Sequence, residues 1–64
     1  MLIDYKKLQK ECARRCCNMN EVLKLAHIST LTMQRIKSGK EVRPRTAGKL
    51  AQALEVDVVE LIKE

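Results

Sequence analysis

This 64-residue chain contains three cysteines, which could form a disulfide or bind a metal, and one histidine, which could bind a metal. Cys12 and Cys16 stand four residues apart, so a helix would place them on one face, with His27 as a third ligand. A C-x-x-C pair is missing and a fourth ligand is unassigned, which argues against zinc. Cys16 and Cys17 are adjacent, and an odd number of cysteines fits no disulfide framework. We therefore expect free cysteines that pack as small apolar residues in a reducing cytoplasm, and no metal site.

The basic side chains are concentrated in one segment and could bind a polyanion. The net charge of the chain is +5, and residues 35–49 carry six basic residues against Glu41, which accounts for all of it. The last ten residues carry four acidic side chains and one lysine. A localised basic patch is typical of proteins that bind phosphate groups, although charge alone fits a solvated face with no partner equally well.

Size and composition argue against other classes of function. The longest apolar run is residues 1–3, whereas about 20 apolar residues are needed to cross a bilayer, so we expect no membrane span and no secretory leader. A core this small leaves little room for a substrate pocket, and no nucleophile–base pair is visible. We expect no catalytic residues, no cofactor and no small-molecule ligand. Tyr5 is the single aromatic residue, too few for stacking on single-stranded nucleic acid.

Apolar residues recur at helical spacing and are cut into short segments by turn signals, which predicts helices and no strands. The expected N-cap residues are Asp4, Asn18, Ser29, Thr46 and Asp57. Glu21 and Glu60 complete capping boxes with Asn18 and Asp57. The first helix is expected to end near Cys16, and the third at Ser38 and Gly39.

The predicted architecture is all-α, a compact bundle of five short helices in one domain over residues 1–64. The second and third helices are separated by about three residues, which is typical of a helix-turn-helix. The last helix is expected to carry Val58, Leu61 and Ile62. Because Trp and Phe are missing, aliphatic residues, Met and Cys must build the core, and we expect modest stability.

Five apolar residues follow Met19 at a recognisable spacing: Val22, Ala26, Ile28, Met33 and Ile36. They occupy the apolar places of the helix-turn-helix in the lambdoid phage repressor and Cro family, also called the XRE type, so residues 19–38 resemble that unit. Ser38-Gly39-Lys40, Arg43-Pro44-Arg45 and residues 50–56 look like the continuation of such a domain. The resemblance covers nearly the whole chain. It implies a lambda-repressor-like fold and sequence-specific binding to double-stranded DNA.

The chain departs from the family pattern at four positions. Met19 stands where the family usually has a Gln that contacts phosphate, and Asn18 or Asn20 are candidates to replace it. His27 occupies the turn position that normally holds a Gly in left-handed conformation, at a cost of about 1–2 kcal/mol. We interpret His27 as a turn residue rather than a ligand or base. Cys16 and Glu55 also stand where a helix-ending Gly is common.

The third helix is expected to enter the major groove of DNA, with Met33 and Ile36 turned inward. The resemblance then implies that the base-contacting residues are Thr30, Leu31, Gln34 and Arg35. Arg35 is suited to guanine, Gln34 to adenine and Leu31 to the methyl group of thymine, although each also fits an ordinary exposed helix surface.

Phosphate contacts depend less on geometry than base contacts do. Lys37, Lys40, Arg43 and Arg45 flank the third helix, and by resemblance Arg45 is a candidate for the minor groove. The starts of the second and third helices also present backbone N–H groups to phosphates. The expected phosphate-contacting residues are Asn18, Asn20, Ser29, Thr32, Lys37, Lys40, Arg43 and Arg45.

The sequence therefore predicts a cytoplasmic transcriptional regulator, a repressor of phage, mobile-element or bacterial genes, which is at the nucleoid when bound. By resemblance it binds a palindromic operator as a homodimer, with the loop at residues 41–45 or the last helix near Leu61 as dimer contacts. The alternative is a protein-binding module on the same fold, antitoxin-like or a repressor accessory. In that case Leu31 and Met19 would anchor the interface and an acidic partner would cover the basic patch.

Overall fold

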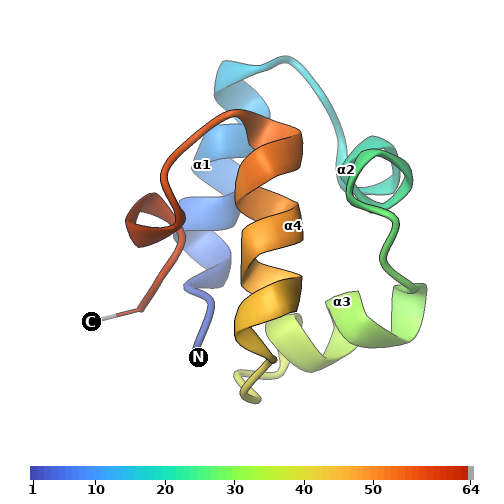
Figure 1. Cartoon of the computed structure of the whole chain (residues 1–64). Helices are drawn as coiled ribbons and strands as arrows, with labels where there is room; N and C mark the ends of the chain where they lie inside the picture. The colour runs from blue at the N-terminus through green and yellow to red at the C-terminus, as the bar shows by residue number, and fades with distance from the viewer. Residues whose placement is uncertain (64) are drawn as a thin grey trace.

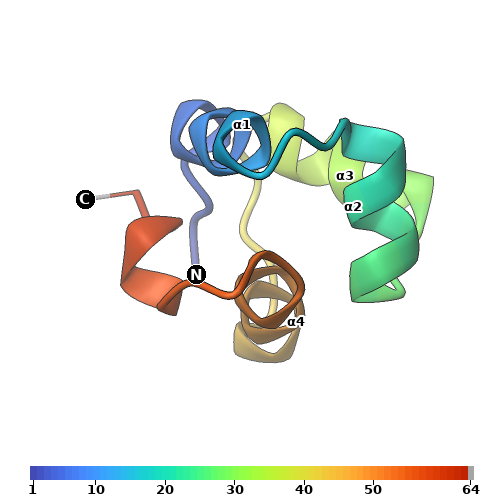
Figure 2. The ribbon, with the colours of Figure 1, turned by 90° about the horizontal axis from the view of Figure 1, so that it is seen from above.

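The computed structural model describes residues 1–63 and confirms the all-α prediction. Its elements are α1 (Tyr5–Arg14), α2 (Met19–Ala26), α3 (Thr30–Lys37), α4 (Pro44–Leu54) and the short 3-10 helix η1 (Val58–Glu60). The axes of α1 and α4 run in a similar direction, while α3 lies crosswise to them (Figure 1). In the view from above, α1 and α4 are both seen end-on (Figure 2). None of the helices formed by residues 1–63 has the length and apolarity that a membrane crossing requires.

Local capping explains where the first three helices begin. The Asp4 side chain accepts hydrogen bonds from the backbone N–H groups of Lys6 and Lys7. Asn18 and Glu21 form the reciprocal capping box at α2, with distances of 2.9 and 3.1 Å. Such caps satisfy N–H groups that have no partner within the helix, so these starts were predictable from short sequence motifs.

The predicted start of α4 at Thr46 is wrong. The helix begins at Pro44, and its N-cap residue Arg43 makes no side-chain capping hydrogen bond. Instead the carbonyl oxygen of Arg43 accepts the backbone N–H of Thr46 at 2.9 Å. Proline has a helical φ, and the N–H that it lacks would have no partner at the first position of a helix, so it suits that position. The same missing N–H prevents proline from continuing a preceding helix.

The predicted fifth α-helix is also wrong, because only the 3-10 turn of η1 forms. Asp57 does cap this turn, through a hydrogen bond from Val59 N–H at 3.1 Å. Ile62 leaves the helical path to form an isolated antiparallel bridge with Ile3. Backbone bonds on both sides of the bridge, Asp4 N–H to Leu61 O at 2.8 Å and Lys63 N–H to Leu2 O at 2.9 Å, fix the end of the chain against its beginning.

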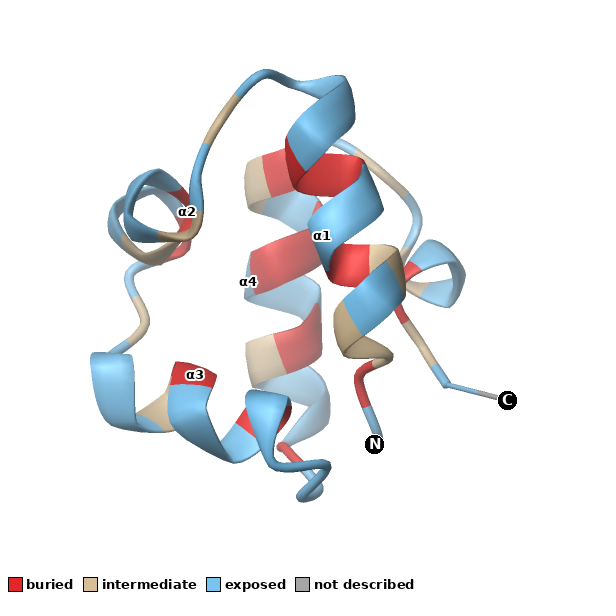
Figure 3. Cartoon of the chain, turned by 180° about the vertical axis from the view of Figure 1, so that it is seen from behind, coloured by how far each residue is buried: buried red, intermediate tan, exposed pale blue. Residues whose placement is uncertain are grey.

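One cluster of buried side chains joins all the elements. The largest side chains with almost no exposed surface are Leu8, Val22, Ile36, Leu50, Leu54 and Leu61. Helix α4 contributes most, because Ala47, Leu50, Ala51 and Leu54 are all buried. In Figure 3 the buried positions of α4 follow one side of the helix, whereas α3 is exposed over most of its length. The core therefore contacts only one side of α3, and the rest of the surface of this helix is accessible.

Candidate nucleic-acid interface

The turn between α2 and α3 has the backbone conformation that was predicted for His27. Its φ is 56° and its ψ is 46°, in the left-handed region. The N–H of His27 donates to Lys24 O at 3.3 Å, and the N–H of Ile28 donates to Leu23 O at 3.1 Å. These two bonds form a Schellman motif, which ends α2 and turns the chain so that α3 starts after three connecting residues.

Helix α3 is fixed by its first residue and by two buried side chains. Ser29 Oγ accepts the backbone N–H of Thr32 at 3.1 Å and lies 3.0 Å from Thr32 Oγ1. Met33 and Ile36 are 7% and 1% exposed, so they anchor the inner face of the helix. As a result α3 is a short helix, capped at its start and anchored on one side, whose outer face lies outside the core.

The four predicted base-contacting residues lie on this outer face. Thr30, Leu31, Gln34 and Arg35 are all exposed. Leu31 is 68% exposed, the largest exposure among the large apolar side chains of residues 1–63. Such exposure leaves the Leu31 side chain available to contact a partner, although single exposed apolar residues also occur on free protein surfaces.

The basic segment after α3 lies on the same side as this outer face. The guanidinium of Arg35 donates to the carbonyl oxygen of Glu41 at 3.3 Å. A groove of about 350 Å³ is lined by Thr32, Arg35, Glu41, Val42, Arg43 and Thr46. The groove therefore brings Arg35 of α3 and Arg43 of the following loop to one surface.

Backbone contacts from the start of the chain hold that loop. Val42 N–H donates to Met1 O at 2.8 Å, and the Met1 amino group donates to Val42 O at 2.9 Å. The side chain of Val42 is 9% exposed and belongs to the core. Lys40 and Arg43 on either side of it are exposed, as are Lys37 at the end of α3 and Arg45 in the first turn of α4.

A second depression joins α2 to the start of α3. It is lined by Asn20, Leu23, Lys24, Ile28, Ser29 and Thr30. Two predicted phosphate contacts, Asn20 and Ser29, therefore lie together. Asn18 lies outside both grooves, and its side-chain oxygen is already occupied in capping α2. Lys24 is a residue that sequence reasoning missed, although its position four residues after Asn20 places both on one helix face.

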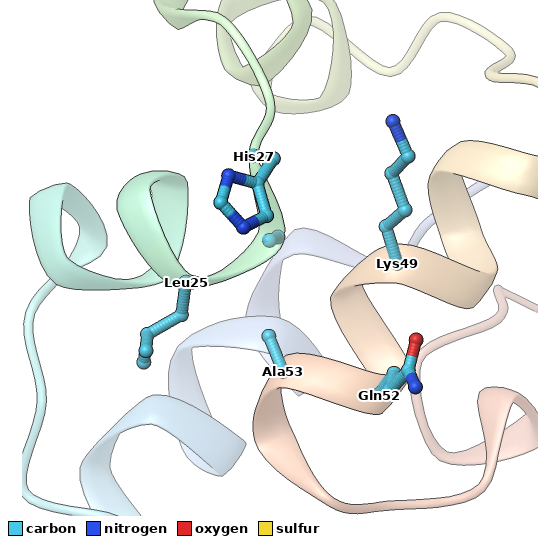
Figure 4. Close-up of a pocket in the computed structure, with 6 residues that line it drawn as sticks. Leu25, His27, Lys49, Gln52 and Ala53 are labelled. Carbon is cyan, nitrogen blue, oxygen red and sulfur yellow. The ribbon is translucent and has the colours of Figure 1, made fainter.

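A third depression lies between the end of α2 and α4 and contains the histidine. Figure 4 shows Leu25 and His27 on one side, and Lys49, Gln52 and Ala53 of α4 on the other. Lys49 adds a positive charge to this depression. Within residues 1–63, no three side chains drawn from His, Cys, Asp and Glu come together in one group.

A family model described as the Cro/C1-type HTH DNA-binding domain matches residues 7–63. No curated protein and no solved structure matches the chain significantly. The matched residues include the whole of α2, the turn, α3 and the basic loop, and they cover most of the chain. The protein belongs to the Cro/C1-type helix-turn-helix family of DNA-binding domains.

Proposed function

We propose that this DNA-binding domain is a sequence-specific transcriptional regulator that represses phage, mobile-element or bacterial genes. Helix α3 enters the major groove, where Arg35 contacts guanine, Gln34 contacts adenine, and Leu31 contacts the methyl group of thymine, with Thr30 beside them. The observation that carries this proposal is the exposure of these four side chains on a helix anchored by Met33 and Ile36. Leu31 in particular has no role in the core.

Phosphates on either side of the major groove bind to two groups of residues. One group lines or flanks the groove beside α3: Thr32, Lys37, Lys40, Arg43 and Arg45. The other lies along α2 and at the start of α3: Asn18, Asn20, Lys24 and Ser29. These contacts set the position of α3 but carry no sequence information, whereas the outer face of α3 selects the site.

The protein binds as a homodimer to a palindromic operator whose half-sites lie about one helical turn apart. The loop at residues 41–45 is exposed at Glu41, Arg43 and Arg45, which supports a role for it in dimer contacts. Leu61 is fully buried in the monomer, so a second copy has no access to it. The dimer prediction near Leu61 is therefore restricted to the exposed residues of η1, Val59 and Glu60.

Selection of bound sequences from a random duplex pool, followed by gel shifts, tests this function. We expect a palindromic consensus for the wild type. Arg35→Ala is expected to abolish the preference at one base position and to cost about 1–3 kcal/mol on the selected site. Lys10→Ala, which removes an exposed charge of the same sign from α1, is the matched control and is expected to leave affinity unchanged. Equal losses for Arg35→Ala on selected and random DNA would mean that Arg35 contacts only the backbone.

The exposure of Leu31 also favours a second candidate function, a protein-binding module that is antitoxin-like or a repressor accessory. Its other predicted anchor, Met19, is half-buried, and its sulfur contacts Cys12 at 3.9 Å, which weakens the case for it as an interface residue. A selection that yields no consensus, with binding to random DNA only at low salt, would favour this module.

A further inference from the structure

The end of α1 brings sulfur atoms together through the same backbone motif that ends α2. Cys17 N–H donates to Cys12 O, and Cys16 N–H donates to Ala13 O, both at 3.0 Å. Cys16 occupies the left-handed position, with a φ of 54°. In this Schellman motif the side chains at the positions of Cys12 and Cys17 lie against each other. The backbone therefore fixes a pair of thiols and directs Cys16 away from it.

Contacts to the two thiols bring in a third sulfur atom. Cys12 Sγ lies 3.9 Å from the thioether Sδ of Met19, the first residue of α2. Cys17 Sγ donates to Cys12 O at 3.6 Å. Burial, together with the charge of Cys17 and a hydrogen bond with its side chain, raises the pKa of the Cys12 thiol to about 11. Cys12 thus faces Cys17 on one side and Met19 on another.

This donor set fits a soft monovalent metal ion. A first-row metal bonds sulfur at about 2.3 Å, so three sulfur ligands in a trigonal plane stand about 4 Å apart, close to the Cys12–Met19 separation. Oxygen donors do not contribute, because the nearby Glu11 carboxylate is paired with Arg14 at 3.0 Å. Thiolate and thioether ligands suit soft metal ions rather than magnesium or calcium. Three sulfur ligands are one short of the four that a structural zinc site uses, which favours copper(I).

We propose that Cys12, Cys17 and Met19 form a copper(I) site at the junction of α1 and α2. Cys12 is buried, whereas Cys17 and Met19 are half-buried, so the ion enters from the side of Cys17. Binding replaces the two thiol protons, which are released to solvent, and leaves the oxidation state of the metal unchanged. The bound ion links the last turn of α1 to the first residue of the helix-turn-helix.

The test is a copper(I) titration of the reduced full-length chain under anaerobic conditions, with a coloured copper(I) chelator as competitor. We expect the wild type to remove one equivalent of copper from the chelator. Cys17→Ala is expected to weaken binding by more than about 100-fold, since even outer-shell partners of a metal contribute about 10–100-fold. Met19→Leu, which keeps the size of the side chain, is expected to weaken it by about tenfold.

Cys16→Ala is the matched control, because Cys16 is exposed and adjacent to the site without belonging to it. It is expected to keep the wild-type affinity and the copper-dependent rise in melting temperature that binding to the folded state produces. The proposal is overturned if the wild type takes up no copper, or if Cys16→Ala loses as much affinity as Cys17→Ala, which would indicate the adjacent cysteine pair. An unchanged affinity in Met19→Leu would remove the third ligand and equally overturn the three-sulfur site.

Discussion

The end of α3 differs from the ends of the other three α-helices in one respect. All four helices end with the same two backbone hydrogen bonds of the Schellman motif. At α1, α2 and α4, the two side chains that this motif brings together are apolar: Cys12 and Cys17, Leu23 and Ile28, Ala51 and Val56. At α3 they are Arg35 and Lys40. Three helix ends therefore contribute to packing, while the fourth gathers positive charge at the proposed DNA surface.

The residue in left-handed conformation also distinguishes α3 from α1, α2 and α4. Cys16, His27 and Glu55 have φ angles of 54°, 56° and 57°, whereas α3 ends with Gly39 at 80°. A side chain in this region costs about 1–2 kcal/mol, and apolar contact between the paired residues offsets that cost at three helices. Arg35 and Lys40 supply no such contact, so only glycine ends α3 without strain. The comparison suggests that strain is tolerated where packing compensates for it.

The largest effect is expected when the apolar pair at the end of α2 is broken. Leu23 is half-buried and packs against the core, so Leu23→Ala is expected to lower the free energy of unfolding by about 2 kcal/mol, the lower end for such truncations. Arg35→Ala, at the equivalent position of α3, is expected to change it by less than about 0.5 kcal/mol. Urea denaturation followed by circular dichroism measures both. Similar losses would mean that the end of α3 is also a packing element.

Much of this fold follows from local sequence signals. Asn18 with Glu21 and Ser29 cap their helices as predicted, because a cap is satisfied by residues within three positions of it. The left-handed turn at His27 was predictable from the place of a missing glycine. Ile62 shows the limit: its apolar spacing fits a helix, but pairing with Ile3, distant in sequence, determines its conformation.

The candidate site also combines features that follow from local sequence with features that depend on tertiary packing. Helical periodicity alone indicates that Thr30, Leu31, Gln34 and Arg35 point away from Met33 and Ile36, and the structure has all four exposed. The position of Lys24 depends also on tertiary packing. Its spacing from Asn20 places both residues on one face of α2, but that spacing does not show that this face borders the start of α3. The contact of Arg35 with Glu41 O depends on the path of the loop, which the backbone of Met1 holds in place.

An intermediate effect is expected from exchanging the left-handed residues. His27→Gly is expected to raise the free energy of unfolding by about 1 kcal/mol, because the strain relieved exceeds the extra entropy of glycine in the unfolded chain. Gly39→Ala is the reverse experiment. No atom lies within 4 Å of the added Cβ, so its expected loss of about 1 kcal/mol comes from the backbone alone.

Thermal and urea unfolding of both variants measure these changes. A loss of stability in His27→Gly would show that the imidazole contributes contacts worth more than the strain, and would contradict the comparison at α2. No loss in Gly39→Ala would show that α3 needs no glycine at its end.

The smallest effect on stability, and the sharpest contrast between stability and binding, is expected for Lys40→Ala. Lys40 is exposed and stands beside Arg35, so removing one of two like charges is expected to change the free energy of unfolding by less than about 0.5 kcal/mol. If Arg35 and Lys40 contact DNA, the affinity of Lys40→Ala falls on selected and random duplexes alike, because a phosphate contact carries no sequence preference.

The salt dependence of binding gives a second measurement. With about four phosphate contacts in each subunit of a dimer, the wild-type slope of log affinity against log salt is about −7, at about −0.9 per contact. Lys40→Ala removes two of these eight contacts and is expected to flatten the slope by about 2. An unchanged slope would mean that Lys40 lies outside the DNA interface. The positive charge at the end of α3 would then have no partner.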